Sequence, residues 1–312
     1  MRSAMSDFSR RRFLTIFAAA SALSAAPFAL KAQYPVRTWK GVAMGSAASI
    51  SLSHPNADDI LLRATRELER LENIFSLYRE NSTLAQLNRD GVVNTPPFEL
   101  LECLGLCGTI NRASGGLFDP TVQSLWQVYA QSYSEGRAPE NALIRKTLSR
   151  TGWDKVLINQ SQVSFKKQDM AMTLNGIAQG YVADRIAKLL RDDGLNNVLI
   201  NTGEFAALGG HPEGKDWPVS INTGSEIRKE RVMLRDNAVA TSLPNGTFFD
   251  QAGLVGHILD PRTGRPAQAR PTAVSVTATK AAVADGLSTA ICLMNKGEAD
   301  KLLAQFPSAK LV

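Results

Sequence analysis

The chain has 312 residues, of which 44% are hydrophobic and 21% are charged, and its formal net charge at pH 7 is +6. Residues 1–32 hold five basic residues and one acidic residue, so the rest of the chain is close to neutral and lacks the basic stripe of nucleic-acid-binding proteins. The composition therefore predicts a globular protein with a large core and argues against a nucleic-acid partner.

Residues 1–32 are expected to be a twin-arginine signal peptide. Three arginines at 10–12 precede an alanine-rich apolar stretch from Phe13 to Leu30, and cleavage is expected after Ala32. The alternative is a membrane anchor, but a stretch of 18 residues interrupted by Pro27 is marginal for the roughly 20 that a spanning helix needs. We therefore expect a periplasmic protein with no stable membrane insertion after the signal is removed.

Hydrophobic periodicity predicts one domain over residues 35–312. A broken strand over 38–53 precedes an amphipathic helix over 57–78, which we expect Asn56 to cap. Further helices are predicted at 97–113, 119–135, 140–150, 177–192, 281–294 and 296–305. Strands are predicted at 156–158, 163–165, 171–174, 197–201, 218–222, 231–234, 238–240, 257–259 and 273–277. Because helices concentrate early and strands late, the predicted fold class is α+β, with a largely antiparallel or mixed sheet packed with helices.

The cysteines do not indicate a disulfide scaffold. The chain has three, and Cys103 and Cys107 lie four residues apart on one face of a predicted helix. No second pair of ligands accompanies them, and a disulfide within one helical turn rarely reaches the required geometry. We expect free thiols in the core.

The segment Gly256–Pro266 ends a predicted strand in a tight turn that exposes polar side chains together. His257 is followed by Asp260, Arg262 and Thr263 within this turn. The pattern indicates a site, although Asp-Pro and Thr-Gly are also ordinary turn chemistry.

Three further segments place small residues beside hydroxyl or carboxylate groups at the boundaries of elements. Residues 115–122 join two helices through Asp119-Pro120, and residues 174–181 open a helix whose first N–H groups suit a phosphate. Asp285 and Thr289 project from one helix face, and their hard oxygens suit Mg²⁺. Each segment also has a structural explanation: a capping aspartate, close packing of small residues, or a threonine bonded back into its helix.

Together these segments resemble the ApbE family of FAD:protein FMN transferases, in the right order over nearly the whole predicted domain. The motifs are Met44-Gly45-Ser46, Phe75-Ser76-x-Tyr78-Arg79, Phe118-Asp119-Pro120-Thr121-Val122, Gly176-Ile177-Ala178-x-Gly180-Tyr181, His257-x-x-Asp260-Pro261-x-Thr263-Gly264 and Asp285-x-x-Ser288-Thr289-Ala290. The resemblance implies Mg²⁺-dependent transfer of FMN from FAD to a Ser or Thr hydroxyl of a partner protein, with release of AMP. The expected acceptors are membrane-associated redox proteins with a periplasmic Ser/Thr-Gly-Ala-Thr/Ser-like segment.

The resemblance also implies roles for individual residues. Asp285, Thr289 and the backbone oxygen of Gly176 would bind Mg²⁺. His257 would either stabilise the diphosphate or move a proton, and the sequence leaves both roles open. The residues expected to contact FAD are Met44 and Tyr78, which would flank the adenine, and Leu117, Phe118, Asp119, Thr173, Gln179, Ile258 and Ser288.

The chain departs from the family pattern at two places. Thr173 and Gln179 stand where the family commonly has an acid and a lysine, and we interpret this double change as a coupled variant of the site. Residues 201–205 also differ from the common Gly-Gly-Asp pattern. These features resemble the branch associated with nitrous oxide reductase maturation.

Two other functions fit the same residues. An FAD diphosphatase would use water in place of the protein hydroxyl, and a periplasmic flavin-binding protein would carry out no reaction. A carrier has no need of a metal on the diphosphate, so the presence of Asp285 and Thr289 favours catalysis.

Overall fold

A seven-stranded sheet forms the centre of the computed structural model, which describes residues 34–222, 229–267 and 273–312. The predicted signal peptide lies outside the described residues. The strand order is β1-β2-β6-β7-β10-β13-β14, and each neighbouring pair is antiparallel. The strands are β1 (Arg37–Ala43), β2 (Ser46–Leu52), β6 (Val198–Asn201), β7 (Phe205–Leu208), β10 (Ala238–Ser242), β13 (Val274–Ala278) and β14 (Lys310–Leu311). The predicted α+β class with a largely antiparallel sheet is confirmed.

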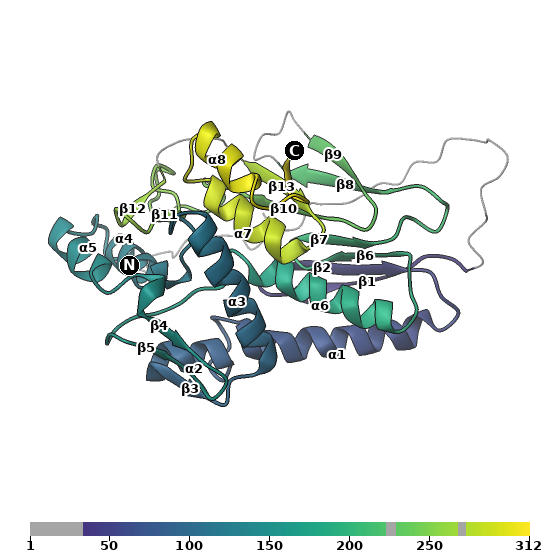
Figure 1. Ribbon diagram of the computed structural model, residues 1–312, viewed down its shortest axis with the longest axis horizontal. Helices are drawn as coiled ribbons and strands as arrows, with labels where there is room; N and C mark the ends of the chain where they lie inside the picture. The colour runs from purple at the N-terminus through teal and green to yellow at the C-terminus, as the bar shows by residue number, and fades with distance from the viewer. Residues whose placement is uncertain (1–33, 223–228, 268–272) are drawn as a thin grey trace, which may run out of the picture.

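Helices cover one face of this sheet, and a hairpin covers the other. In Figure 1, α6 (Ala178–Asp192) and α7 (Ala281–Ile291) lie against the strands, with α1 (Ala57–Phe75), α3 (Phe98–Ala113) and α8 (Lys296–Leu303) around them. The hairpin β8 (Trp217–Asn222)–β9 (Lys229–Leu234) packs its buried Trp217 with Ala207 and Val239 of the sheet. Ala206 and Ala238, their chain neighbours, point into the main core instead. The middle strands are therefore buried on both faces.

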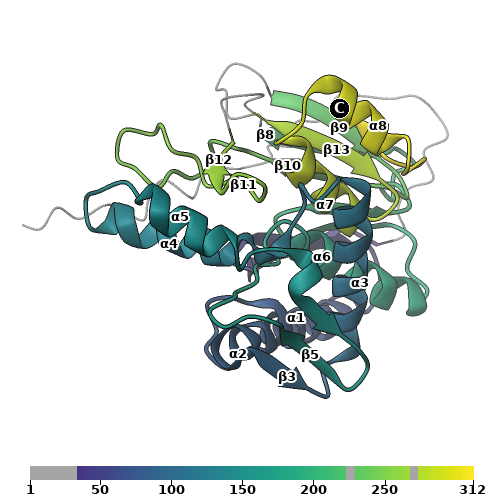
Figure 2. The ribbon, with the colours of Figure 1, turned by 60° about the vertical axis from the view of Figure 1, so that its left-hand side comes forward.

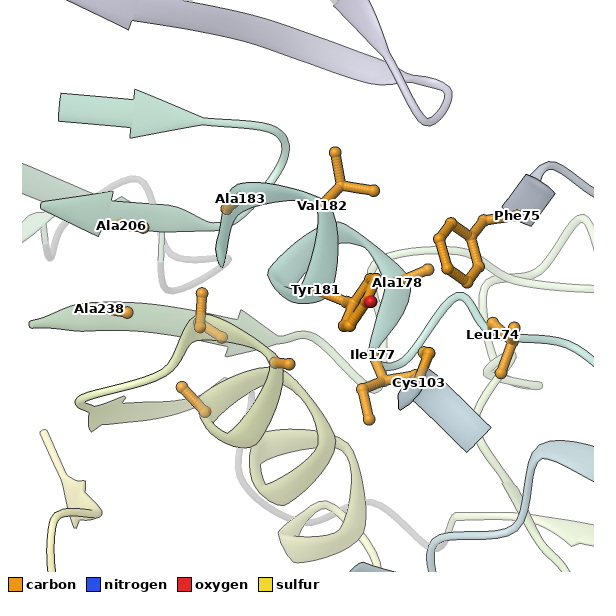
Figure 3. Packing of buried hydrophobic residues seen from close by; sticks show 14 of the residues in the cluster. Phe75, Cys103, Leu174, Ile177, Ala178, Tyr181, Val182, Ala183, Ala206 and Ala238 are labelled. Atoms are coloured by element: carbon orange, nitrogen blue, oxygen red, sulfur yellow. The ribbon is translucent and has the colours of Figure 1, made fainter. Parts of the chain in front are cut away.

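The main core surrounds α6 (Figure 3). Tyr181 of α6 packs its ring edge-on against Phe75 of α1, with centroids 5.3 Å apart. Alanines such as Ala178 and Ala183 allow neighbouring elements to approach closely. The three cysteines are buried free thiols, as predicted, and burial raises the pKa of Cys107 well above its ordinary value.

Two further groups of elements adjoin this core (Figure 2). One comprises α2 (Thr83–Asp90) and the small sheet β3 (Val92–Asn94)–β5 (Gln162–Phe165)–β4 (Val156–Ile158), and its Leu87, Val93 and Val163 belong to the main core. The other comprises α4 (Gln123–Ser134), α5 (Asn141–Leu148) and the pair β11 (Leu259–Asp260)–β12 (Arg265–Pro266). Leu125 of α4, Ile144 of α5 and Leu259 of β11 share a separate small core. The ring of Phe249 adds to it by packing against Trp126. This core anchors the predicted turn at Gly256–Pro266, called the histidine turn below, to α4 and α5.

Several predicted elements need correction. Residues 171–174 form no strand, because Met172 bonds to the side chain of Asn88 and the N–H of Thr173 donates to Pro120. The strand predicted over 257–259 begins only at Leu259. The helix predicted over 57–78 ends at Phe75, and Asn56 stands at its cap position without a side-chain hydrogen bond. The predictions also missed α2, β3 and β7.

Over residues 34–222, 229–267 and 273–312, no helix is both long and apolar enough to cross a membrane.

Candidate active site

A cavity of about 790 Å³ brings the predicted site residues together. Its wall comes from the end of α1 and α2, the start of α4, the segment before α6, the β10 end, the histidine turn and α7. The predicted residues in the wall are Tyr78, Leu117, Phe118, Asp119, Thr173, Gly176, Gln179, His257, Ile258, Asp285 and Thr289. Met44 and Ser288 are not part of the described wall. Sequence motifs that lie more than 200 residues apart thus meet in one place.

Asp285, Thr289 and Gly176 meet at one side of the cavity. A Cβ on Gly176 would lie 2.8 Å from Oγ1 of Thr289, so only a glycine leaves room for the threonine hydroxyl there. The hydroxyl lies 3.2 Å from Oγ of Ser242, and Oδ2 of Asp285 accepts a hydrogen bond from the N–H of Gly180 at 3.1 Å. The carboxylate of Asp285, the hydroxyl of Thr289 and the backbone of Gly176 line one cavity and form an oxygen-rich set of the kind that Mg²⁺ prefers.

The position of α7 is fixed by two residues of α6. A Cβ on Gly180 would lie 2.3 Å from the carbonyl oxygen of Ala281, so the two helices touch through a glycine. Asp184 accepts hydrogen bonds from the N–H groups of Ala281 at 2.8 Å and Ala282 at 3.0 Å. These groups begin α7, where the helix offers them no internal partner. Asp184 thus sets the start of the helix that carries Asp285.

We expect Asp184→Ala to destabilise the protein by about 1–3 kcal/mol, because two N–H groups at the start of α7 lose their acceptor. Asp184→Asn is the matched comparison, since its amide oxygen keeps one of the two bonds and should lose less. Urea unfolding of both variants measures the difference. Equal stability of Asp184→Ala and the wild type would contradict this capping role.

A second buried carboxylate, Glu204, lines the same side of the cavity and was not singled out from the sequence as a site residue. Its Oε2 accepts a hydrogen bond from the N–H of Thr241 at 3.0 Å. Burial raises the pKa of Asp285 to about 7, and burial together with Asp285 raises the pKa of Glu204 well above its ordinary value. Among the described wall residues, only Arg89 carries a permanent positive charge. A bound divalent cation would compensate these carboxylates and an anionic diphosphate together.

His257 is half-buried, and its ring lies in the cavity wall. Its Nδ1 lies 3.2 Å from the carbonyl oxygen of Thr247. A carbonyl can only accept, so this bond leaves Nε2 as a free acceptor in the neutral ring. Burial lowers the pKa of His257, which favours that neutral form.

The other polar residues of the histidine turn serve its structure. Asp260 accepts hydrogen bonds from the N–H and the guanidinium of Arg262. Gly264 has φ +67°, and a Cβ there would lie 2.8 Å from Ile144. The turn therefore docks on α5 and holds His257 at the cavity.

Asp119 and Ser288 are engaged within the protein. Both oxygens of Asp119 accept hydrogen bonds, from Thr121 and from the N–H of Trp153 at 2.9 Å, so it acts as the capping aspartate of the alternative interpretation, and its contact with FAD stays a prediction. Ser288 is fully buried, donates to the carbonyl oxygen of Asp285 at 2.9 Å and lies 2.7 Å from Oγ of Ser242. It therefore lies behind the wall and supports it.

The two residues that depart from the family pattern also have partners within the protein. Nε2 of Gln179 donates to Oγ of Ser46 at 2.8 Å and more weakly to the carbonyl oxygen of Met44 at 3.4 Å. Oγ1 of Thr173 accepts from the N–H of Asn175 at 3.2 Å. Both side chains line the cavity, and their contacts with FAD stay a prediction.

Comparison with known proteins matches residues 44–311 to the ApbE family. The chain is 27% identical to the FAD:protein FMN transferase of Haemophilus influenzae, covering 91% of this chain and 87% of that protein. It is 28% identical to the enzyme of the same name from Treponema pallidum, covering 77% and 72%. The crystal structure of the ApbE protein from Thermotoga maritima superposes with a TM-score of 0.79 at 27% identity, covering 89% of this chain and 93% of that one. The apo flavinyl transferase ApbE of Pseudomonas stutzeri gives a TM-score of 0.76 at 24% identity, covering 87% and 89%. The chain belongs to the ApbE family.

Proposed function

We propose that this protein is a Mg²⁺-dependent FAD:protein FMN transferase. The observation that carries the proposal is the cavity in which Asp285, Thr289 and Gly176 face the same space as His257 and Tyr78. Its volume of about 790 Å³ is within the range of cavities that hold cofactor-sized ligands. The relatives that carry the name FAD:protein FMN transferase support the same reaction.

Asp285, Thr289 and the backbone oxygen of Gly176 would hold the metal ion. When bound, Mg²⁺ neutralises the diphosphate and polarises the phosphorus under attack. Burial raises the pKa of Asp285 to about 7 and that of Glu204 well above its ordinary value, so a bound cation would stabilise the ionised carboxylates in this poorly solvated site. The contact between α6 and α7 through Gly180 and Asp184 holds the proposed metal-binding residues Asp285 and Thr289 in place.

His257 is proposed as the proton acceptor, because burial lowers its pKa and favours the neutral ring, in which Nε2 is free to accept. The hydroxyl oxygen of the acceptor protein attacks the phosphorus on the FMN side of FAD, and its proton passes to Nε2 of His257. The bond from this phosphorus to the bridging oxygen breaks, and AMP leaves with that oxygen. The flavin remains on the acceptor through a phosphoester.

The rate of flavin transfer is expected to rise with pH and to reach a plateau, with a midpoint below the ordinary histidine pKa of 6.5. Protonation of His257 removes the acceptor lone pair, and burial opposes that protonation. Single-turnover assays from pH 5 to pH 9 at saturating Mg²⁺, which keeps Asp285 ionised, would measure the midpoint. His257→Ala should lose this acidic limb, and a midpoint above 6.5 would contradict the assignment.

We further propose that the acceptor is a membrane-associated redox protein with a periplasmic Ser/Thr-Gly-Ala-Thr/Ser-like segment. The arginines at 10–12 and the apolar stretch that follows support export by the twin-arginine route, although this stretch lies outside the described residues. The neutral pair Thr173 and Gln179 supports a place in the branch associated with nitrous oxide reductase maturation.

One experiment separates the transferase from its alternatives. The purified protein is incubated with FAD, Mg²⁺ and an acceptor domain, and both AMP and flavin that stays bound after denaturation are measured. Covalent flavin with equimolar AMP supports the transferase. AMP with only free FMN supports an FAD diphosphatase instead, and tight FAD binding without AMP supports a flavin-binding protein.

A further inference from the structure

The turn between β1 and β2 has an unusual backbone. Met44 has φ +51° and Gly45 has φ +76°, so this two-residue hairpin needs positive φ at both positions. Gly45 adopts such a conformation freely, but a methionine does so at a cost. Backbone conformations of this kind persist only where surrounding contacts hold them.

Side chains from two helices hold this turn. The N–H of Met44 donates to Oε1 of Glu72 on α1 at 2.5 Å. From the other side, Nε2 of Gln179 on α6 donates to Oγ of Ser46 at 2.8 Å and lies 3.4 Å from the carbonyl oxygen of Met44. Both polar backbone groups of the strained residue therefore have side-chain partners.

Glu72 also connects the turn to the loop that carries Tyr78. Its Oε2 accepts a hydrogen bond from the guanidinium of Arg79, the residue after Tyr78. The N–H groups of Tyr78 and Arg79 both donate to Oγ of Ser76, at 3.1 Å and 3.2 Å. One carboxylate thus joins two segments that are 30 residues or more apart in the chain.

The turn and the loop meet at the edge of the cavity. Tyr78 lines the cavity with 77% of its surface exposed, and a Cβ on Gly45 would lie 4.0 Å from its Cε2. An aromatic ring that is exposed yet carried on a well-bonded loop is suited to stacking against a planar group. The glycine beside it leaves the space next to the ring open.

We propose that Glu72 and Gln179 are positioning residues that hold the Met44–Ser46 turn against Tyr78 and so form a fixed edge for the adenine half of FAD. The proposal rests on the proposed function for the identity of the ligand. Neither residue acts on the diphosphate in this role. Their effect is transmitted through the backbone of Met44 and through Arg79.

The test measures binding of the two halves of FAD separately. Glu72→Ala is expected to weaken AMP binding by about tenfold and to raise the KM for FAD, while FMN binding and kcat stay near wild type. Titration calorimetry with AMP and with FMN, and flavin-transfer kinetics, give these values. The matched control is Glu67→Ala on the same helix, which removes an ion pair with Arg70 and should leave AMP binding unchanged.

Glu72→Gln provides the decisive second variant. Its amide oxygen can still accept the hydrogen bond from the N–H of Met44, so Glu72→Gln should keep most of the AMP affinity that Glu72→Ala loses. Urea unfolding of both variants separates this effect from a simple loss of stability. Gln179→Ala should also weaken AMP binding, and its effect should be less than additive with Glu72→Ala because both residues hold one turn.

Three results would overturn the proposal: unchanged AMP affinity in Glu72→Ala, an equal loss of AMP and FMN binding, or the same loss of AMP affinity in Glu72→Gln as in Glu72→Ala. Failure of the proposed function has a different signature. In that case the wild type would form no covalent flavin, while the AMP measurements on the variants would still report on the turn.

Discussion

Asp285→Asn is expected to reduce Mg²⁺-dependent FAD cleavage by about 10³-fold or more, because the carboxylate is the only charged member of the proposed metal-binding set. The folded-state pKa of about 7 lies above the ordinary aspartate pKa of 3.8, so the ionised side chain destabilises the metal-free protein at pH 8. The stabilisation associated with the protonated group is complete below pH 3.8 and is lost as pH rises through about 7. Asparagine removes that ionisation and keeps an acceptor for the N–H of Gly180.

The variant should therefore be inactive yet have a higher Tm than the wild type at pH 8 without metal. Adding Mg²⁺ should raise the Tm of the wild type and leave that of Asp285→Asn unchanged. Thermal unfolding with and without Mg²⁺, together with AMP release, tests both points. Asp192→Asn, at an exposed pair with Lys188 on α6, is the control and should match the wild type. Retained Mg²⁺-dependent turnover in Asp285→Asn would refute the metal assignment.

Gly180→Ala is expected to destabilise the protein by about 3 kcal/mol or more, since overpacking of a close backbone contact forces the elements apart. The added Cβ would lie 2.3 Å from the carbonyl oxygen of Ala281 and 2.7 Å from the N of Ala282. Both atoms belong to the backbone, so a change of rotamer cannot relieve the clash. Movement of α7 would also displace Asp285 and Thr289, so Mg²⁺ affinity should fall with stability.

Gly105→Ala is the matched control for Gly180→Ala, and it is expected to raise the stability of the protein. Gly105 lies inside α3, and a Cβ there would meet no atom within 4 Å. Gly105→Ala should stabilise the protein by about 0.5–1 kcal/mol through the higher helix propensity of alanine. Urea unfolding of the two variants compares them directly. A stability of Gly180→Ala equal to that of the wild type would show that the α6–α7 contact adapts more easily than its geometry indicates.

Sequence patterns predicted the elements that have one buried face. The helix from Ala57 has apolar residues every three or four positions, and it forms as predicted except that it ends at Phe75. The strand β7 was missed because Ala206 and Ala207 are buried on opposite faces, so the segment does not alternate in polarity. The apolar run at 171–174 is buried too, but its backbone bonds to Asn88 and Pro120 instead of a neighbouring strand. Such partners come from distant parts of the chain and leave no local signal.

The sequence likewise predicted some residues of the candidate site and missed others. Helical spacing placed Asp285 and Thr289 on one face, and the structure confirms that both line the cavity. Ser288 is one residue from Thr289 and therefore turned by about 100° from it, and its buried hydroxyl donates to the carbonyl oxygen of Asp285 behind the cavity wall. Glu72 and Asp184 were not singled out because each acts on the backbone of another element. The motifs thus indicated which segments form the site, and the packing of those segments determines which residues support it.

The pairing of β2 with β6 has a consequence for when activity can appear during folding. Ser49 lies beside Asn201, so residues 53–197 form one long excursion between two neighbouring strands. The cavity takes Tyr78, Leu117 and Thr173 from this excursion, and His257 and Asp285 from the chain that follows it. The cavity is therefore complete only when this excursion and the chain that follows it have both folded, so flavin loading reports on the folding of both parts. Ligands that touch both sides should protect the excursion and the sheet from proteolysis together.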